Sequence, residues 1–219
     1  MRLSTLTATV LAALALATVA RAEETVRCGD AGYSYAGIGG LATANGVRAT
    51  LRFSSAPTVA SGHVAAWVGF GGYGAGRNGS NAWLQVGVIT KAGSAPSLYY
   101  EMTQPGAEPA MTLLGPAVPG RAYRLRVSES RPGWWQAFVD GKAVSPRLFL
   151  AGSHGNWEAT ATAESWDGAQ PACNRFGFDF ARVNVRHTQA WLPFGGRVTL
   201  QSSGYRVSAA RPDSFRAQG

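Results

Sequence analysis

Short stretches of alternating apolar and polar residues recur along this chain and constrain its fold more than any other feature. Residues 47–53 carry an apolar side chain at every second position, and residues 176–180 do the same with three phenylalanines. Side chains of a strand point alternately to its two faces, so a period of two indicates strands with one buried face. The chain is therefore expected to consist mainly of half-buried strands.

Turn signals separate these stretches. The sequence holds 28 glycines and 11 prolines, Asp140-Gly141 is typical of a tight hairpin, and the Gly-rich residues 71–79 predict a loop. Further strands are expected at residues 63–70, 82–90, 98–103, 123–127, 134–139, 147–150 and 157–165, with one or two more between 197 and 208. About nine to eleven strands without an amphipathic helix predict an all-β fold, an antiparallel β-sandwich whose strand order stays open.

The N-terminus has the pattern of a secretory signal peptide. A basic start at Arg2 precedes an apolar stretch, residues 6–20, and then the small-residue site Ala20-Arg21-Ala22. The stretch is shorter than the roughly 18 apolar residues that span a bilayer, which argues against a membrane anchor. We expect cleavage near Ala22, a secreted chain (extracellular or periplasmic) and no transmembrane segment in the mature protein.

The remaining chain divides by composition. Residues 23–45 are Gly- and Ala-rich and predict an extended N-terminal arm, residues 46–208 predict the β-sandwich domain, and residues 209–219 predict a disordered tail. The two cysteines, Cys28 and Cys173, predict one disulfide if the chain is exported. Two free thiols in a reducing compartment are the alternative.

Basic charge is spread along the chain. The sequence has 20 Lys and Arg against 12 Asp and Glu, and loss of Arg2 and Arg21 with the signal peptide leaves a net charge of +6. Nucleic-acid-binding proteins usually cluster such residues beside exposed aromatic side chains. We therefore expect no nucleic-acid partner, although weak attraction to acidic surfaces or polymers stays open. The protein is expected to be a monomer.

Familiar catalytic signatures are absent. The sequence holds no G-x-S-x-G, H-E-x-x-H or G-x-x-x-x-G-K motif, and its three histidines are far apart. We therefore expect neither a metal nor a cofactor. Glu158 and Glu164 share a strand face but lie roughly 20 Å apart at the rise of a strand, too far for a glycosidase pair. Glu101 could instead meet Glu164 across strands.

Four short segments resemble the eqolisin family of glutamic peptidases, which belong to the concanavalin A-like lectin/glucanase superfamily. They are Ala66–Phe70 (AWVGF), Trp83–Val88 (WLQVGV), Tyr99–Glu101 (YYE) and Ala163–Glu164 (AE). The resemblance spans about residues 47–186 and implies a divergent protein with a concanavalin A-like jelly roll. The chain departs from the family at Met102, where an aromatic residue is usual, and at Ser165, which intervenes before Trp166.

The resemblance also implies roles for two residues. Glu164 would be the general base that activates water, and Gln85 would donate a hydrogen bond to the oxyanion. Each lies on the face of its strand opposite the small aliphatic side chains, so both can line one groove. The residues expected to bind substrate are all aromatic: Trp67, Trp83, Tyr100 and Trp166.

Three classes of function remain. A secreted glutamic-type endopeptidase is the hypothesis that assigns roles to named residues. The alternative is a non-catalytic secreted module that binds a glycan or a peptide on a Trp-lined concave sheet, because aromatic side chains with polar tips suit such ligands. A structural or interaction protein of the cell surface needs neither Gln85 nor Glu164.

Overall fold

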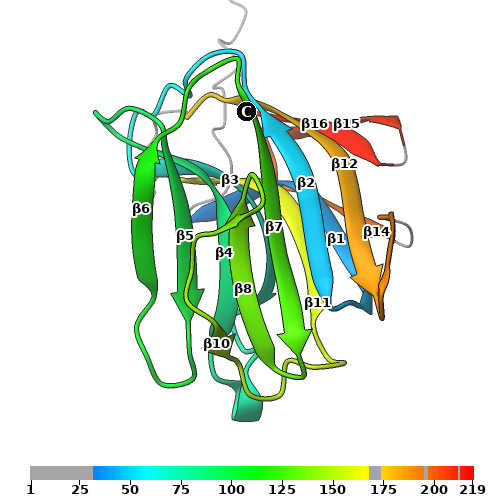
Figure 1. Cartoon of the computed structure of the whole chain (residues 1–219). Coiled ribbons are helices and arrows are strands. Elements are labelled where there is room, and N and C mark those ends of the chain that lie inside the picture. Colours follow the sequence, from blue (N-terminus) through cyan, green and yellow to red (C-terminus); the bar gives the residue numbers. More distant parts are fainter. Residues whose placement is uncertain (1–31, 168–173, 195–196, 212) are drawn as a thin grey trace, which may run out of the picture.

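Two antiparallel β-sheets lie face to face in the computed structural model (Figure 1). The structure describes residues 32–167, 174–194, 197–211 and 213–219. The apolar face of each sheet points toward the other sheet, and the polar faces point outward. This arrangement confirms the predicted all-β sandwich.

The first sheet has seven strands. In spatial order they are β14 (Arg197–Gln201), β1 (Tyr33–Thr43), β11 (Glu158–Trp166), β3 (His63–Gly72), β4 (Ala82–Lys91), β5 (Ser97–Thr103) and β6 (Ala110–Pro116). A single turn of 3-10 helix, Arg77–Gly79, lies in the loop between β3 and β4.

The second sheet is built around β2. Its order is β10 (Leu148–Phe149), β8 (Trp134–Val139), β7 (Ala122–Arg131), β2 (Gly46–Arg52), β12 (Gly177–His187), β16 (Ser214–Gln218) and β15 (Arg206–Arg211). Two short strands extend it, because β9 (Lys142–Ala143) pairs with β8 and β13 (Ala190–Pro193) pairs with β12.

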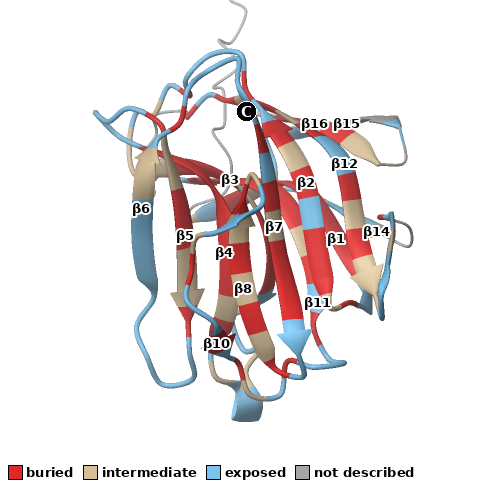
Figure 2. Ribbon diagram, viewed as in Figure 1, coloured by how far each residue is buried: buried red, intermediate tan, exposed pale blue. Residues whose placement is uncertain are grey.

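The core between the sheets follows the alternation of the sequence. On β4, Leu84, Val86 and Val88 are fully buried in it, and Gln85 points to the opposite face. Buried segments consequently alternate with exposed ones along β7 and β2 (Figure 2). Each large apolar side chain buried in this way contributes about 1.5–3 kcal/mol.

Two of the tryptophans belong to this core. Trp135 and Trp157 are buried with ring centroids 6.1 Å apart. Trp135 Nε1 donates a hydrogen bond to Ser153 Oγ at 2.7 Å, and Trp157 Nε1 donates to the Ala75 carbonyl oxygen at 2.8 Å. Both indole N–H groups therefore have partners, as burial of a tryptophan requires.

Two expected boundaries are wrong. Residues 33–43, expected in an N-terminal arm, form β1, an inner strand of the first sheet that pairs with β11 and β14. Residues 214–218, expected in a disordered tail, form β16 between β12 and β15. Phe215 and Ala217 are buried there, and the Phe215 ring stacks on Phe180 at 4.5 Å. The sandwich therefore extends from β1 to β16.

The predicted hairpin is present. Asp140 and Gly141 both have positive φ angles, 50° and 85°, as a two-residue turn between antiparallel strands requires. The expected signal peptide, Cys28 and Cys173 lie outside the described residues. Within the described part of the chain, no helix is long and apolar enough to cross a bilayer.

Candidate functional site

A pocket of about 270 Å³ lies on the outer face of the first sheet. Polar and aromatic side chains share its lining, which comprises Tyr33, Tyr35, Trp67, Phe70, Gly71, Gly72, Tyr73, Trp83, Gln85, Glu101, Thr160, Thr162, Glu164 and Leu200. We call it the outer pocket. Strands β1, β11, β3, β4 and β5 all contribute to it, so residues far apart in sequence meet there.

Strand register determines how the outer pocket is arranged. Thr162, Trp67 and Gly87 lie opposite one another on β11, β3 and β4 and form one row across the sheet. Glu164 lies in the row on one side of Trp67, and Gln85 lies in the row on the other side. On β3, the residues opposite them are small, namely Ala65 opposite Glu164 and Gly69 opposite Gln85. These small residues on β3 leave room for the pocket between the larger side chains.

Both carboxylate oxygens of Glu164 have a partner on β3. Its Oε1 lies 3.1 Å from His63 Nε2, and its Oε2 accepts a hydrogen bond from Trp67 Nε1 at 3.2 Å. The residue is only 8% exposed. His63 and Trp67, four residues apart on one strand, fix the carboxylate plane, because each holds a different oxygen.

The Gln85 amide is held just as firmly. Its Nε2 donates to the Tyr99 hydroxyl at 3.2 Å and to Glu101 Oε2 at 3.0 Å. Both partners come from β5, where Glu101 lies directly opposite Gln85. A primary amide nitrogen has two hydrogens, so a substrate oxygen must displace one of these partners to receive a hydrogen bond from Gln85.

The electrostatics of the outer pocket are dominated by its two carboxyl groups. Burial raises the pKa of Glu101 above its ordinary value, and the charge of Glu164 raises it further. His63, the Gln85 hydrogen bond and Lys91 act in the opposite direction on the pKa of Glu101. A carboxyl that resists ionisation therefore lies beside the Gln85 amide.

Tyrosines cover one side of the carboxyl groups. Burial, followed by the charge of Glu164, raises the pKa of Tyr33 to about 12 and also raises the pKa of Tyr35. These phenols consequently stay protonated at ordinary pH and can donate hydrogen bonds. Tyr73, a third tyrosine of the lining, packs against Trp83 with ring centroids 5.5 Å apart.

The predicted site residues divide into three groups. Gln85, Glu164, Trp67 and Trp83 line the outer pocket together. Tyr100 was expected to bind substrate, but it points into the hydrophobic core because its neighbour Glu101 occupies the outer face. Trp166 lies outside the pocket lining, 39% exposed, with its ring 5.8 Å from that of His63.

Several residues of the site are not predicted from the sequence. Tyr33 and Tyr35 come from β1, which the glycine-rich composition of the N-terminal segment concealed. His63, which contacts Glu164 without lining the pocket, is also not predicted as part of the site. Its position at the start of a strand preceding Trp67 by four residues was the available signal, since that spacing puts both side chains on one face.

This arrangement can support acid–base chemistry. A fixed carboxylate, an amide donor and a second carboxyl with a raised pKa share one small pocket. Such a set can take a proton from water and stabilise negative charge on a neighbouring oxygen. Among the described residues, no three His, Cys, Asp or Glu side chains are grouped closely enough to hold a metal ion.

Solved structures of glutamic peptidases share this fold. Scytalido-glutamic peptidase, solved with a peptide-based transition-state analogue, superposes with a TM-score of 0.64 at 16% identity, covering 84% of this chain and 97% of that one. SCP-B, an eqolisin solved with the tripeptide Ala-Ile-His, gives 0.60 at 15% identity, covering 84% and 96%. The chain thus shares the β-sandwich fold of these two peptidases.

Sequence comparisons add no nearer relative. No family model matches the chain, and no curated protein matches it.

Proposed function

We propose that the protein is a secreted endopeptidase of the glutamic type, with Glu164 as general base and Gln85 as oxyanion donor. The observation that supports this most directly is that the two residues share one pocket while the His63 and Trp67 side chains hold the carboxylate. The peptide ligands of the two similar structures, whose fold this chain shares, are consistent with a polypeptide substrate.

The first step would be attack of water on the scissile carbonyl. Glu164 takes one proton from the water, the water oxygen bonds to the carbonyl carbon, and the carbonyl oxygen becomes an oxyanion. The Gln85 amide donates to that oxyanion. Loss of one such donor typically costs about 2.7–4 kcal/mol of transition-state stabilisation.

The second step would break the peptide bond. Protonated Glu164 returns its proton to the amide nitrogen, the carbon–nitrogen bond breaks, and the amine leaves. Glu164 is a carboxylate again, and the water has been divided between the two products. The indole of Trp67 and the imidazole of His63 keep the carboxylate aimed throughout, which reduces the entropic cost of the reaction.

Glu101 would modulate the oxyanion site. In the free protein its Oε2 accepts from the Gln85 amide, so an ionised Glu101 competes with a substrate oxyanion for that donor. A neutral Glu101 competes less, because the hydrogen bond loses its charge-assisted component. The raised pKa of Glu101 therefore favours a working pH on the acidic side.

The test is proteolysis of denatured protein substrates from about pH 2 to 8. Wild-type protein is compared with Glu164→Gln, Gln85→Ala and the control Glu158→Gln. Glu158 lies on the same strand but is exposed and outside the pocket lining. Cleavage that disappears in the first two variants and persists in the control supports both roles. A folded wild type that cleaves nothing at any pH rules the peptidase out.

A non-catalytic binding module is the second candidate. The specific observation in its favour is the aromatic lining, in which Trp67, Trp83 and three tyrosines surround an amide whose two donors already have partners. Such a module would bind a glycan or peptide and would retain binding in Glu164→Gln. If the wild type cleaves no substrate, its equilibrium binding of peptides and neutral oligosaccharides is measured next. Such binding without cleavage supports the binding module.

A further inference from the structure

A second pocket, of about 390 Å³, lies on the outer face of the other sheet, away from the outer pocket. Strands β7, β2 and β12 form its floor, and four arginines contribute to its walls. Its lining comprises Arg48, Ala49, Thr50, Arg124, Leu125, Arg126, Phe138, Gly141, Arg182, Asn184 and Asp213. We call it the arginine pocket. Its volume is within the range of small-ligand sites.

Strand register places like charges opposite one another in this pocket. Arg126 on β7 lies directly opposite Arg48 on β2, and Arg48 lies opposite Asn184 on β12. Like charges in such cross-strand pairs destabilise a sheet. Burial, followed by the charges of Arg186 and Arg48, lowers the pKa of Arg126 from its ordinary value. The free protein therefore carries concentrated, mutually repelling positive charge.

Neighbouring acidic residues do not neutralise Arg48 or Arg126. Asp140 is engaged with Arg121 at 3.0 Å and with Arg124 at 3.7 Å. Among the described residues, no carboxylate lies within ion-pair distance of Arg48 or Arg126, and Asp213 is the remaining acidic residue of the lining. An anionic ligand could supply the missing charge.

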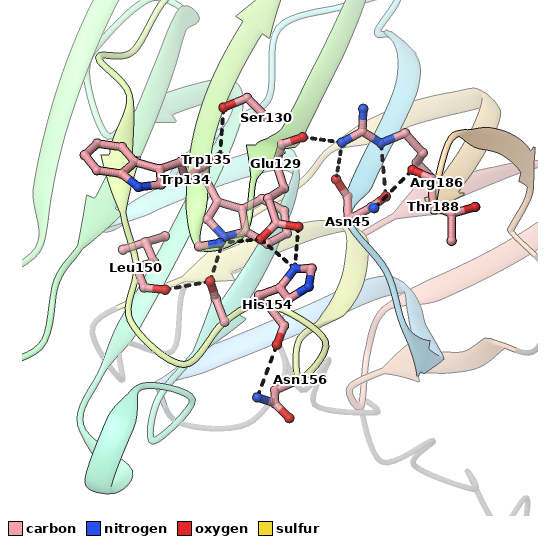
Figure 3. Close-up of polar contacts among 12 residues, drawn as sticks. Asn45, Glu129, Ser130, Trp134, Trp135, Leu150, His154, Asn156, Arg186 and Thr188 are labelled. Carbon is pink, nitrogen blue, oxygen red and sulfur yellow. Dashed lines mark hydrogen bonds and ion pairs between the residues drawn. The ribbon is translucent and has the colours of Figure 1, made fainter.

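Arg186, close by, has a different role. Its guanidinium donates to Asn45 Oδ1 at 3.0 Å, to the Asn45 carbonyl oxygen at 2.9 Å and to the Glu129 carbonyl oxygen (Figure 3). It thus ties β12 to the turn between β1 and β2 and to β7. Its charge still reaches Arg126, as the lowered pKa of Arg126 shows.

An aromatic ring lies against the guanidinium group of each of the two arginines that have no acidic partner among the described residues, Arg48 and Arg126. Arg126 lies over the Phe138 ring at 3.8 Å from its centroid, and Arg48 lies over the Trp191 ring at 4.5 Å. A stacked guanidinium is pre-organised and keeps its in-plane N–H donors available for a carboxylate. An arginine therefore lies over each of these two rings.

Neutral hydrogen-bonding groups lie between the charges. Thr50 follows Arg48 by two residues on the same face of β2. Asn184 Oδ1 accepts from Arg48 Nε at 3.2 Å, which leaves the Asn184 amide N–H groups as donors. The pocket thus alternates partners for carboxylates with partners for hydroxyls, and Arg124 and Arg182 also line it.

From this alternation we infer that the arginine pocket binds an acidic polysaccharide, with sugar carboxylates on Arg48 and Arg126 and hydroxyls on Thr50 and Asn184. A uronic acid chain presents both groups on each unit. This inference does not depend on the proposed peptidase activity, because the two pockets lie on different sheets.

The first experiment uses oligogalacturonate as the probe and its fully methyl-esterified form as the matched control. Titration calorimetry at about 50 mM salt should detect binding of the acid, weakening as salt rises, because exposed charge–charge attraction is screened. The methyl ester keeps the hydroxyls but lacks charge, and it should bind at least about tenfold more weakly. Equal binding of the two forms would overturn the inference, as would no binding of the acid.

Variants then locate the site. Arg126→Gln and Arg48→Gln should each weaken oligogalacturonate binding about tenfold or more, since each removes a charged hydrogen-bond donor. Arg126→Lys keeps the charge but loses the planar fork, and it should also weaken binding. The control is Arg147→Gln, an exposed arginine outside the pocket lining, which makes the same change of charge. Equal losses in all variants would indicate general attraction and overturn the site.

Two competing ligands complete the test. Single-stranded oligothymidylate and anionic phospholipid vesicles carry phosphate charges without sugar carboxylates. If either binds more tightly than oligogalacturonate at equal salt, and Arg126→Gln abolishes that binding, the pocket serves another class of ligand and the inference fails. Circular dichroism of each variant establishes that the sandwich is intact.

Discussion

At the scale of single residues, His63 is the feature that most changes the interpretation of the site. Its Nε2 lies 3.1 Å from Glu164 Oε1, and its ring is also near those of Tyr33 and Trp166. Trp67 holds the other oxygen of Glu164. With His63 absent, the carboxylate could rotate about its contact with Trp67. We therefore treat His63 as a positioning residue for Glu164.

The corresponding prediction compares two substitutions of His63. His63→Ala removes the contact and should lower kcat for peptide cleavage by about ten- to a hundredfold, the cost expected for a misaligned catalytic group. KM should change little, because His63 does not line the outer pocket. His63→Gln can still offer an N–H to Glu164 and should recover part of the loss.

The control for His63 is His187→Ala, a histidine at the end of β12 in the second sheet. Steady-state kinetics of the three variants separate positioning from stability. If Ala and Gln at position 63 reduced kcat equally, or if KM rose while kcat held, the positioning role would be wrong.

Glu101 leads to a prediction about pH. In the folded protein its pKa lies above the ordinary value because of burial and of the charge on Glu164. A group with a raised folded-state pKa stabilises fully below the unfolded-state pKa, and that contribution is lost as pH rises through the folded-state value. Glu101→Gln has no proton to lose. Its stability relative to wild type should therefore increase from pH 4 to pH 8.

Urea unfolding at these two pH values measures the difference in free energy of unfolding. Glu108→Gln, an exposed carboxyl in the loop between β5 and β6, is the control and should show no comparable trend. The free energy of unfolding of Glu101→Gln minus that of wild type should rise with pH. If this difference stayed constant or fell, the raised pKa of Glu101 would be wrong.

At the scale of elements, the floor of the outer pocket depends on close approach between strands. A Cβ added to Gly87 on β4 would lie 2.1 Å from the Ala66 carbonyl oxygen and 2.8 Å from the Trp67 Cα. Those atoms belong to β3 and cannot move without shifting Trp67. The glycine therefore maintains the spacing of the strands that hold Glu164 and Gln85.

Gly87→Ala should consequently destabilise the protein by about 1–3 kcal/mol, the usual cost of overpacking. Gly39→Ala on β1 is the matched control, because its added Cβ would meet nothing closer than 3.4 Å. Thermal unfolding of both variants is the measurement. Equal melting temperatures for Gly87→Ala and the wild type would show that the strands can separate at little cost.

The sequence predicts those strands that bury one face and expose the other. β2, β4, β7 and β11 each bury one face completely, and their alternation is clear in the sequence. β1 lacks that contrast, since its outer face carries glycines. The reason is local, because a Cβ at Gly37 would lie 2.4 Å from Thr162 atoms. β6 is a largely exposed edge strand between prolines, so its composition looks like that of a loop.

The candidate site was predictable only in part, because alternation describes single strands and not how they pair. Alternation alone places Gln85 and Glu164 on the outer faces of their strands, and it places Tyr100 and Glu101 on opposite faces. It does not tell which of the last two faces the core. Strand order and register, which bring Tyr33, Tyr35 and His63 to Glu164, depend on contacts between segments distant in sequence.

At the scale of the whole molecule, the two outer faces of one sandwich have different chemistry. The first sheet presents carboxyls, an amide and aromatic side chains, and the second presents arginines. The core between them separates the two sites, so substitutions in one pocket should leave the other unchanged when they lie far apart without shared partners.

The last prediction concerns how the C-terminal strand closes this sandwich. Phe215 on β16 is buried, and its ring stacks on Phe180 of β12 at 4.5 Å with an interplanar angle of 9°. Because β16 lies between β12 and β15, losing this ring would leave a cavity beneath an inner strand of the sheet. Phe215→Ala should therefore cost about 3–5 kcal/mol. Gln218→Ala, at the end of the same strand, should stay within about 0.5 kcal/mol of wild type. Chemical denaturation measures both costs, because the midpoint and slope of each curve give the free energy of unfolding. A cost below about 1 kcal/mol for Phe215→Ala would mean that the C-terminal strand is peripheral to the folded core.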